Sequence, residues 1–370
     1  MVMRTQVLVV GGGPAGATAA RRLAASGKEV MLVERDLSFR KPCGGGIASS
    51  ALDELDIPRD VPHRVVRTIR FVSPSGRVLD IPLRGGEILV VDRRAFDSLL
   101  RRLAAEAGAE VVEGEFTGLQ SKRRGLKSRV LIDGEAVTVE SDYLIASDGV
   151  NSRVRRAAGL DPSDYVFTLS APVGGLETDA CEFWFGSEHA PSSYSWVFPR
   201  VDGDSAGGCS VGTGMSYGRD ARACFGRFLD RLGISAEGVT ARGYKVPSWK
   251  HGPYTAGRVL FAGDAAAQVM PFTYEGIYYA MKSGEFAAEA VTGGRLSLYG
   301  KLWRRRFLSR FRLMRTLEGV FLRNDAGAEK LFDIFCRPEV QEASMRLWLR
   351  KEAGRGSLLS YINLFRKFLH

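Results

Sequence analysis

The sequence predicts a mixed α/β fold, in which a mainly parallel sheet is interrupted by a mainly antiparallel one and followed by a helical C-terminal region. The chain opens with a strand, a glycine-rich turn, a helix and a second strand over residues 5–34. Two later strands, within 142–156 and 257–291, each run into a turn made of Asp and Gly and then into a helix-like stretch. Short apolar runs separated by turn residues fill 61–87 and 166–249, as in antiparallel strands.

The composition is that of an ordinary globular protein without disulfides. The 370 residues are enough for two domains, and 45% of them are hydrophobic. No apolar run approaches the roughly 18 residues of a membrane span, and we expect no signal peptide in the glycine-rich N-terminus. Four scattered histidines predict no metal site. The cysteines are odd in number and scattered, which predicts a reducing, cytoplasmic location; they are Cys43, Cys181, Cys209, Cys224 and Cys336.

The net charge of +10 is unevenly distributed along the chain. Residues 301–323 carry eight Lys or Arg and a single acid, Glu318, and their large apolar side chains recur at helical spacing. This pattern is typical of a basic amphipathic helix that lies on the inner face of a membrane. It is equally typical of a helix that packs on its own domain and leaves a basic face in solvent. No basic stretch matches a nucleic-acid-binding element, so we expect no nucleic-acid partner.

The first 34 residues fit the βαβ unit that binds dinucleotides. TQVLVV is a strand, GGGPAG fits G-x-G-x-x-G, and KEVMLVE is a strand that ends at Glu34, which would accept from ribose hydroxyls. Gly11 allows the tight turn, Gly13 lets a pyrophosphate approach the backbone, and Gly16 lets helix and strand pack closely. The helix N-terminus would donate to the phosphates. The same predicted site includes Pro14, Ala15 and Arg35.

Two later segments place an acid where a strand ends. DYLIASDG runs into a turn at Asp148, and GRVLFAGDAA runs into Gly263 and Asp264. Asp264 can accept from a ribityl hydroxyl. The helix that starts at Gly276 and Ile277 can face a flavin pyrimidine, where negative charge builds on reduction. Each segment alone also fits a plain strand, turn and helix.

Together, these three segments resemble the FAD-dependent oxidoreductases with the p-hydroxybenzoate hydroxylase-type fold. VVDRRAFDSLL (90–100) fits a further element, with Arg93 three residues before an aromatic. The resemblance implies that FAD is the cofactor and that Arg93 lies near its phosphates. It also implies a Rossmann-like FAD-binding domain with an inserted, mainly antiparallel β-sheet substrate domain. The alternative for Arg93 is a surface arginine at a helix start.

Three further segments resemble the geranylgeranyl reductase family. They are KPCGGG (41–46), YSWVFPR (194–200) and MPFTYEGIYYAMKSG (270–284). The resemblance implies a reductase that saturates isoprenoid double bonds by hydride transfer from reduced FAD, with NAD(P)H or reduced ferredoxin as electron donor. Tyr274 stands where the family has glycine. We assign the family's G-x-G strand to Gly208-Cys209-Ser210.

The same resemblance implies the site residues. Cys43 would face the flavin, and Gly44 and Gly45 would let the backbone approach the ring closely. Cys43 would either tune the position of the flavin or assist protonation of the product, although a buried, inert cysteine is the common alternative. The Tyr194 hydroxyl would contact either the substrate head group or the proton. The predicted wall of a dry, apolar tunnel includes Phe183 and Phe185. The predicted substrate contacts are Tyr194, Trp196, Phe198, Pro271 and Tyr274.

Other functions on this fold stay open at this point. They are an FAD-dependent monooxygenase (an aromatic hydroxylase or halogenase-like enzyme), an electron-transfer flavoprotein and a prenyl carrier. The halogenase lysine and tryptophan motif and a cluster-binding cysteine set are not recognisable in the sequence. The expected partner is an isoprenoid or prenyl lipid. Its identity, the electron donor and the oligomeric state do not follow from the sequence.

The predicted domains are discontinuous. The FAD-binding domain takes 1–60, 88–165 and 250–295, the substrate domain takes 61–87 and 166–249, and a basic helical region takes 296–370. Two hairpins are predicted, with Ser75-Gly76 and Asp133-Gly134 at their turns.

Overall fold

The computed structural model describes residues 1–121, 125–201, 207–216 and 218–351, which form two compact units. The first unit contains Met1–Arg40, Arg94–Tyr165 and Val246–Ser309; the second contains Lys41–Arg93, Val166–Lys245 and Arg310–His370. Residues 41–60 and 88–93, which the sequence grouped with 1–40, thus belong to the second unit. The predicted C-terminal region is divided after Ser309, and its end at 352–370 lies outside the described residues.

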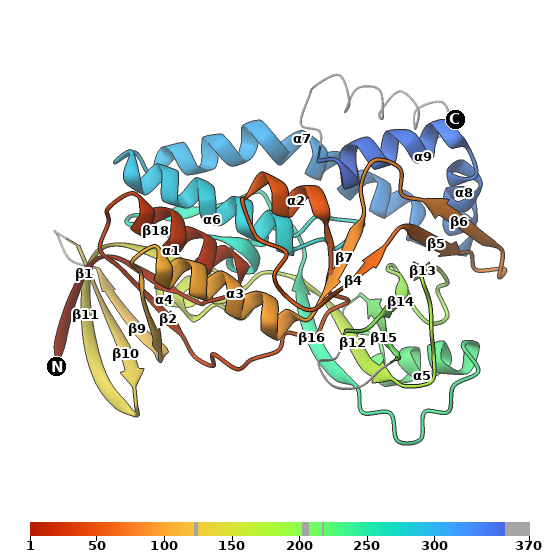
Figure 1. Cartoon of the computed structure of the whole chain (residues 1–370), viewed down its shortest axis with the longest axis horizontal. Coiled ribbons are helices and arrows are strands. Elements are labelled where there is room, and N and C mark those ends of the chain that lie inside the picture. Colours follow the sequence, from red (N-terminus) through yellow and green to blue (C-terminus); the bar gives the residue numbers. More distant parts are fainter. Residues whose placement is uncertain (122–124, 202–206, 217, 352–370) are drawn as a thin grey trace. The chain divides into compact units, whose positions relative to one another are not determined.

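An eight-stranded sheet forms the first unit (Figure 1). Its parallel part has the order β18-β11-β1-β2-β8, with bounds Val259–Phe261, Glu135–Ala146, Val2–Val10, Val30–Glu34 and Glu110–Glu113. Antiparallel strands β17 (Thr255–Ala256), β10 (Leu126–Ile132) and β9 (Glu115–Ser121) extend it. Residues 7–10 of β1 are buried irrespective of the face on which they lie, as expected for a central parallel strand.

The helices of the first unit begin where strands end. They are α1 (Pro14–Ala25), α3 (Arg93–Glu106), α4 (Arg153–Ala157), a 3₁₀ turn η1 (Gly263–Ala266) and α6 (Ile277–Thr292). α1 and α6 lie side by side (Figure 1). Gly284 of α6 permits this contact, because a Cβ there would lie 2.1 Å from the carbonyl oxygen of Ala15. The first turn of α1 therefore packs against the middle of α6 within this unit.

Both predicted hairpins are confirmed. Strands β10 and β11 pair with Ile132 opposite Glu135, and the turn residues Asp133 and Gly134 have φ of 52° and 81°. Two successive positive φ values are those of a type I′ turn, which Asp-Gly favours. In the second unit, β5 (Thr68–Val72) pairs with β6 (Val78–Pro82) around Gly76, whose φ is 88°.

A seven-stranded sheet organises the second unit, with the order β16-β12-β15-β14-β13-β5-β6. The strands not yet bounded are β16 (Arg242–Pro247), β12 (Tyr165–Val173), β15 (Cys209–Met215), β14 (Ser195–Pro199) and β13 (Cys181–Trp184). β5 pairs parallel with β13, whereas the β5–β6, β12–β15, β13–β14 and β14–β15 pairs are antiparallel. One face packs on α5 (Ala221–Arg231), where Phe225 and Phe228 contact the core around Val197 and Val211.

Smaller elements complete the second unit. A three-stranded sheet consists of β3 (Gly46–Ala48), β7 (Ile88–Val91) and β4 (His63–Val66), and α2 (Ser49–Glu54) follows β3. Toward the C-terminus lie α7 (Ser297–Phe321), α8 (Asp325–Phe335), α9 (Pro338–Ser344) and a π-helical turn, Met345–Leu349. α7 begins in the first unit and ends in the second.

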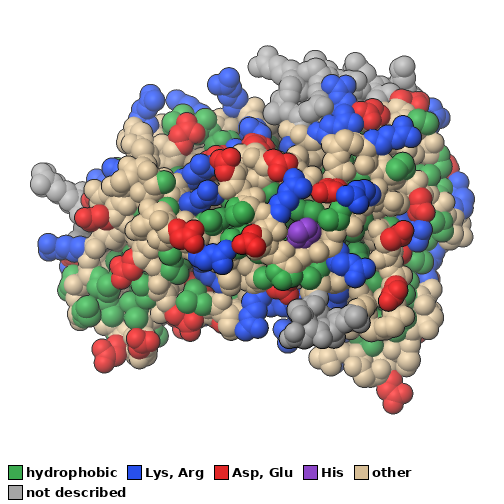
Figure 2. Space-filling model, in the orientation of Figure 1, with side chains coloured by type: hydrophobic (Ala, Val, Ile, Leu, Met, Phe, Trp, Pro, Cys, Tyr) green, Lys and Arg blue, Asp and Glu red, His purple; other side chains and the backbone are tan. Residues whose placement is uncertain are grey.

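The structure decides between the two interpretations of the basic helix. The large apolar side chains of α7 are buried within the protein; they are Trp303, Phe307, Phe311, Met314, Leu317 and Phe321. The apolar face of α7 therefore packs on the protein itself, as in the second interpretation, and contact of its basic face with a membrane stays a prediction. Lys and Arg side chains project along the edge that α7 occupies (Figure 2). Among the described helices, none has the length and apolarity needed to cross a membrane.

Candidate cofactor and substrate sites

The glycine-rich loop between β1 and α1 has the geometry of an anion cradle. Gly11 has φ of 100°, and an added Cβ would lie 2.4 Å from the carbonyl oxygen of Ser147. A Cβ on Gly16 would lie 1.9 Å from the carbonyl oxygen of Gly11, so both positions require glycine. Gly13 is the N-cap of α1, has no side-chain cap, and a Cβ there would meet nothing within 4 Å. Open space before an uncapped helix N-terminus suits a pyrophosphate.

Two charged side chains hold this loop at Gly12. Glu34 Oε2 accepts from the Gly12 N–H at 2.6 Å, and its Oε1 accepts from the Asp36 N–H at 3.2 Å. Arg101 Nη1 donates to the Gly12 carbonyl at 3.3 Å. Arg35 is exposed, next to Glu34, while Pro14 begins α1.

Sequence reasoning missed Arg101. It is 8% exposed, and its Nη2 donates to the carbonyl of Leu37 at 2.7 Å and to Ser98 Oγ at 3.0 Å. The one available signal is its spacing on α3, since it falls between buried Asp97 and Ala104 on one stripe of the helix.

Asp148, predicted to contact the cofactor, caps α4 in the structure. Its Oδ1 accepts from Ser152 Oγ at 2.5 Å, and its Oδ2 accepts from the backbone N–H groups of Arg153 (2.7 Å) and Val154 (3.1 Å). Burial raises the pKa of Asp148 above its ordinary value, although these hydrogen bonds act in the opposite direction. The carboxylate therefore fixes the turn at the end of β11.

The second predicted strand–turn–helix segment brings Asp264 close to the start of α6. Gly263 has φ of 62°, and its N–H donates to Ser283 Oγ at 2.8 Å. A Cβ on Gly263 would lie 3.0 Å from that of Ala15. A Cβ on Gly276, the N-cap of α6, would lie 4.0 Å from Asp264 Oδ1, and no side chain caps this helix before Ile277. The carboxylate of Asp264 can accept a hydrogen bond from a ligand hydroxyl. The N-terminus of α6 can stabilise negative charge on a ligand that becomes reduced.

In the second unit, the Cys43 loop packs tightly against protein. Arg93 Nη1 donates to Cys43 Sγ at 3.2 Å. A Cβ on Gly44 would lie 2.6 Å from the Phe198 ring, and one on Gly45 would lie 2.6 Å from the Val91 carbonyl oxygen. Gly45 also has φ of 77°. These two glycines are thus required by their protein neighbours, a reason that the sequence alone did not supply.

The predicted aromatic side chains gather on one face of the seven-stranded sheet, which we call the aromatic face. Phe183 forms edge contacts with Tyr194 at 5.1 Å and with Phe198 at 5.3 Å between ring centroids. Trp196 lies opposite Phe183 in the β13–β14 pair and is 8% exposed. The aromatic face consists of Phe71, Phe183, Phe185, Tyr194, Trp196 and Phe198, with Phe335 of α8 packed on Phe71.

Comparison with known proteins decides the family. The FAD binding domain family matches residues 4–184, and the geranylgeranyl reductase catalytic domain family matches residues 165–241. The chain is 32% identical to the chloroplastic geranylgeranyl diphosphate reductase of Oryza sativa subsp. japonica, over 98% of this chain and 84% of that protein. It is 34% identical to digeranylgeranylglycerophospholipid reductase 2 of Methanothermobacter thermautotrophicus, over 82% of this chain and 84% of that protein. The chain belongs to the geranylgeranyl reductase family.

A solved structure agrees with this membership. The geranylgeranyl bacteriochlorophyll reductase-like protein of Thermoplasma acidophilum superposes with a TM-score of 0.83 at 26% identity, covering 100% of this chain and 99% of that chain. The enzyme is therefore an FAD-dependent oxidoreductase, and the predicted family, fold class and cofactor are confirmed. The residues of its first unit fit FAD, because the glycine cradle and two uncapped helix N-termini occur together there.

Two glycines of β15, Gly212 and Gly214, face the aromatic motif. The assignment of the family's G-x-G strand to Gly208-Cys209-Ser210 stays a prediction. Gly212 lies opposite Trp196, and a Cβ there would lie 2.1 Å from the indole ring. A Cβ on Gly214 would lie 2.4 Å from Ser193 Oγ.

Tyr274, where the family resemblance implies glycine, has an unusual backbone conformation. Tyr274 has φ of 50°, within the left-handed region that favours glycine. It lies in a tight turn, where its N–H donates to the Met270 carbonyl and the Met270 N–H donates to the Glu275 carbonyl, both at 3.0 Å. Pro271 is buried in the same turn. Tyr274 thus adopts a backbone conformation that a glycine would accommodate without strain.

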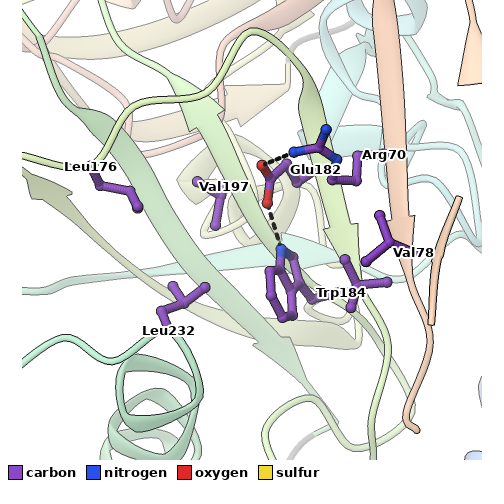
Figure 3. Close-up of a pocket in the computed structure, with 8 residues that line it drawn as sticks. Arg70, Val78, Leu176, Glu182, Trp184, Val197 and Leu232 are labelled. Atoms are coloured by element: carbon purple, nitrogen blue, oxygen red, sulfur yellow. Dashed lines mark hydrogen bonds and ion pairs between the residues drawn. The ribbon is translucent and has the colours of Figure 1, made fainter. Parts of the chain in front are cut away.

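A pocket of about 330 Å³ is lined by residues of the seven-stranded sheet and its neighbours, among them Arg70, Glu182 and Trp184 (Figure 3). Glu182 at its wall accepts from Arg70 at 3.4 Å, from Thr178 Oγ1 at 2.8 Å and from Trp184 Nε1 at 2.8 Å. Because neighbours along a strand alternate between faces, Glu182 and Trp184 point away from Phe183. We therefore do not assign this pocket to the isoprenoid site.

Proposed function

We propose that this reductase saturates double bonds of a geranylgeranyl-type chain carried by a prenyl lipid or prenyl diphosphate. Bound FAD, once reduced, supplies the hydride. An isolated alkene accepts hydride poorly, so a proton must reach the neighbouring carbon nearly in step, in a dry and closely fitted site. The observation that supports this proposal is the aromatic face, whose Phe198 packs directly on the Cys43 loop.

The roles of individual residues follow from this proposal. Cys43 lies beside the aromatic face and carries an exchangeable proton, so we assign it the role of proton donor. Tyr194 is the second candidate, because its ring belongs to the aromatic face and is only partly buried. Trp196 and Phe198 contact the isoprenoid chain. Pro271 and Tyr274 complete the predicted substrate contacts.

FAD binding is assigned to the first unit. Its pyrophosphate takes donors at the N-terminus of α1, and Glu34 keeps lone pairs for ribose hydroxyls. Asp264 accepts a hydrogen bond from the ribityl chain, and the N-terminus of α6 faces the flavin ring. Arg93, which the resemblance implied as a phosphate contact, belongs to the second unit and donates to Cys43 Sγ, so we do not assign it to the phosphates. The proposed electron donor that reduces FAD is NAD(P)H or reduced ferredoxin.

The carrier of the isoprenoid chain is anionic in both relatives named above, as a diphosphate or a phospholipid. A net charge of +10 favours such carriers. We further propose that the enzyme binds the cytoplasmic surface of an anionic membrane through the exposed basic residues of α7, which are Lys301, Arg304, Arg305, Arg312 and Arg315.

An anaerobic incubation tests the function. FAD-loaded protein is reduced with dithionite and mixed in parallel with geranylgeranyl diphosphate, a digeranylgeranyl phospholipid and a prenyl quinone. Mass spectrometry is expected to find products heavier by two hydrogens or multiples of two in one of these classes, which also identifies the carrier. A protein that holds FAD and reduces none of them contradicts the proposal and favours an oxygen-dependent hydroxylase instead.

A further inference from the structure

We propose that Arg93 is the positioning residue of Cys43: it directs the thiol proton away from itself and stabilises the thiolate that remains after proton transfer. This inference rests on the proposed function, in which Cys43 supplies a proton. It starts from one contact, the 3.2 Å hydrogen bond from Arg93 Nη1 to Cys43 Sγ, made by an arginine that is 5% exposed.

The direction of the proton follows from the donor inventory. A guanidinium has only N–H donors and no acceptor, so the sulfur must be the acceptor in this bond. The S–H proton consequently points away from Arg93. The loop cannot easily turn the thiol elsewhere, since Gly44 is packed against the Phe198 ring and the Gly45 carbonyl accepts from the Val91 N–H at 3.0 Å.

The charge balance of the reaction indicates a second role for Arg93, which is to stabilise the thiolate. The S–H proton passes to one alkene carbon, hydride from reduced FAD passes to the other, and the S–H electron pair stays on sulfur as a thiolate. The alkene is reduced, the flavin is oxidised, and water reprotonates the sulfur before the next turnover. Negative charge therefore appears on Sγ, 3.2 Å from a guanidinium nitrogen. A charge-assisted hydrogen bond in a poorly solvated place stabilises it.

Alkylation of the thiol tests the contact without needing any isoprenoid. Cys181, Cys209 and Cys224 are buried and Cys336 is exposed, so C336S leaves Cys43 as the accessible thiol. In FAD-loaded C336S protein, R93M is expected to slow iodoacetamide alkylation of Cys43 roughly tenfold, because the sulfur loses the guanidinium that donates to it and stabilises its negative charge. R93K, which keeps the charge, is expected to remain within about threefold of the parent. Equal alkylation rates in R93M and the parent would overturn the proposal.

A double-mutant cycle tests whether Arg93 acts through Cys43. With the isoprenoid class reduced by the enzyme, C43S and R93M are each expected to lower kcat more than they change KM. The double variant C43S/R93M is expected to have the same kcat as C43S alone, as for residues that act as one unit. Multiplying effects, or a loss of bound FAD that accounts for the whole R93M defect, would instead make Arg93 an independent phosphate contact and overturn the proposal.

Folding and FAD content of the Arg93 variants are controlled separately. R93Q replaces R93M if the latter does not fold, and FAD content is measured for every variant by absorbance. If no isoprenoid is reduced, the proposed function fails. The alkylation series still reports on the Arg93–Cys43 pair in that case, so the two failures are distinguishable.

Discussion

The peptide of Gly12 is held from both ends by ionic side chains. Glu34 accepts from its N–H, and Arg101 donates to its carbonyl. Arg101 is nearly buried, and among the described residues its hydrogen-bond acceptors are two carbonyls and a hydroxyl, with no carboxylate. A buried cation without an acidic partner is costly. We expect a dinucleotide phosphate bound near the loop to offset that cost.

Removing this cation is expected to weaken FAD binding. R101M should raise the Kd for FAD roughly tenfold, because the loop loses a hydrogen bond and a positive charge. The matched control is R102M, since the neighbouring Arg102 is exposed and paired with Glu106 at 3.6 Å. Fluorescence titration of apo-protein with FAD measures both variants. Equal Kd values for the two would show that Arg101 does not position the cofactor loop.

A second buried ionisable residue, His189, sits on the α5 side of the seven-stranded sheet. It is 1% exposed, its Nδ1 lies 2.8 Å from Ser195 Oγ, and Ser195 donates to Thr213 Oγ1 at 2.8 Å. Burial, helped by the charge of Arg231, lowers the pKa of His189 to about 4. The ring is thus a neutral core residue, which sequence analysis did not single out.

This lowered pKa predicts an acid-sensitive fold. Below the ordinary histidine pKa of about 6.5 the unfolded chain takes up a proton that the folded one refuses, so stability falls as the pH drops from about 6.5 toward 4. The loss is about 3 kcal/mol. Urea unfolding at several pH values should show this slope in the parent and in H251Q, whose histidine is exposed, and not in H189Q. An unchanged slope in H189Q would assign the acid sensitivity to other groups.

At the scale of elements, strand register decides which side chains meet. Pairing of β14 with β15 places Trp196 over Gly212, and the same register places Val197 opposite Val211 in the core. A register shift by one residue would exchange these two faces. The aromatic face therefore depends on a glycine in the neighbouring strand.

Gly212 is consequently predicted to tolerate no side chain. G212A should destabilise the second unit by about 1–3 kcal/mol, because its methyl group would overlap the Trp196 indole. W196L in the same chain should recover part of that loss. The control is G226A, within α5, where a Cβ meets nothing within 4 Å and alanine should stabilise the helix by about 0.5–1 kcal/mol. Denaturant unfolding measures all three. A neutral G212A would mean that the strand shifts to make room.

The turn before α6 provides a second prediction at this scale. Tyr274 has a positive φ, which costs a residue with Cβ about 1 kcal/mol or more. Y274G should therefore be about 1 kcal/mol more stable than Y274A, since both variants lose the ring and only glycine relieves the backbone. Thermal unfolding compares the two directly. Equal stability would show that the turn relaxes to negative φ once the ring is gone.

At the scale of the whole molecule, α7 has a buried apolar side and an exposed basic side. Its apolar side chains belong to the protein interior, and its exposed side is basic. Membrane contact through α7 must therefore be electrostatic, without insertion of its apolar face. Such binding is reversible and weakens with salt.

Vesicle binding tests this interpretation. R304Q/R305Q/R312Q should reduce binding to phosphatidylglycerol vesicles by about 1 kcal/mol per charge, and salt should abolish the difference. R219Q/R222Q/R242Q removes the same charge from exposed sites off this helix and should bind like the parent. Sedimentation with vesicles measures both sets. Equal losses in the two triple variants would show that only net charge matters.

The sequence by itself determined the features that are encoded within a few residues. The βαβ unit and the Asp133-Gly134 hairpin turn follow from local periodicity and turn chemistry, and the structure agrees with them. The family follows from the resemblance of its motifs, and the comparisons agree with it. The pairings that join distant segments were decided only by the tertiary structure. Arg93 meets Cys43 across 50 residues and Arg101 meets Gly12 across 89. Strand register and helix packing set these contacts, as they set which face of α7 is buried, because a side chain's partner depends on where distant backbone comes to lie.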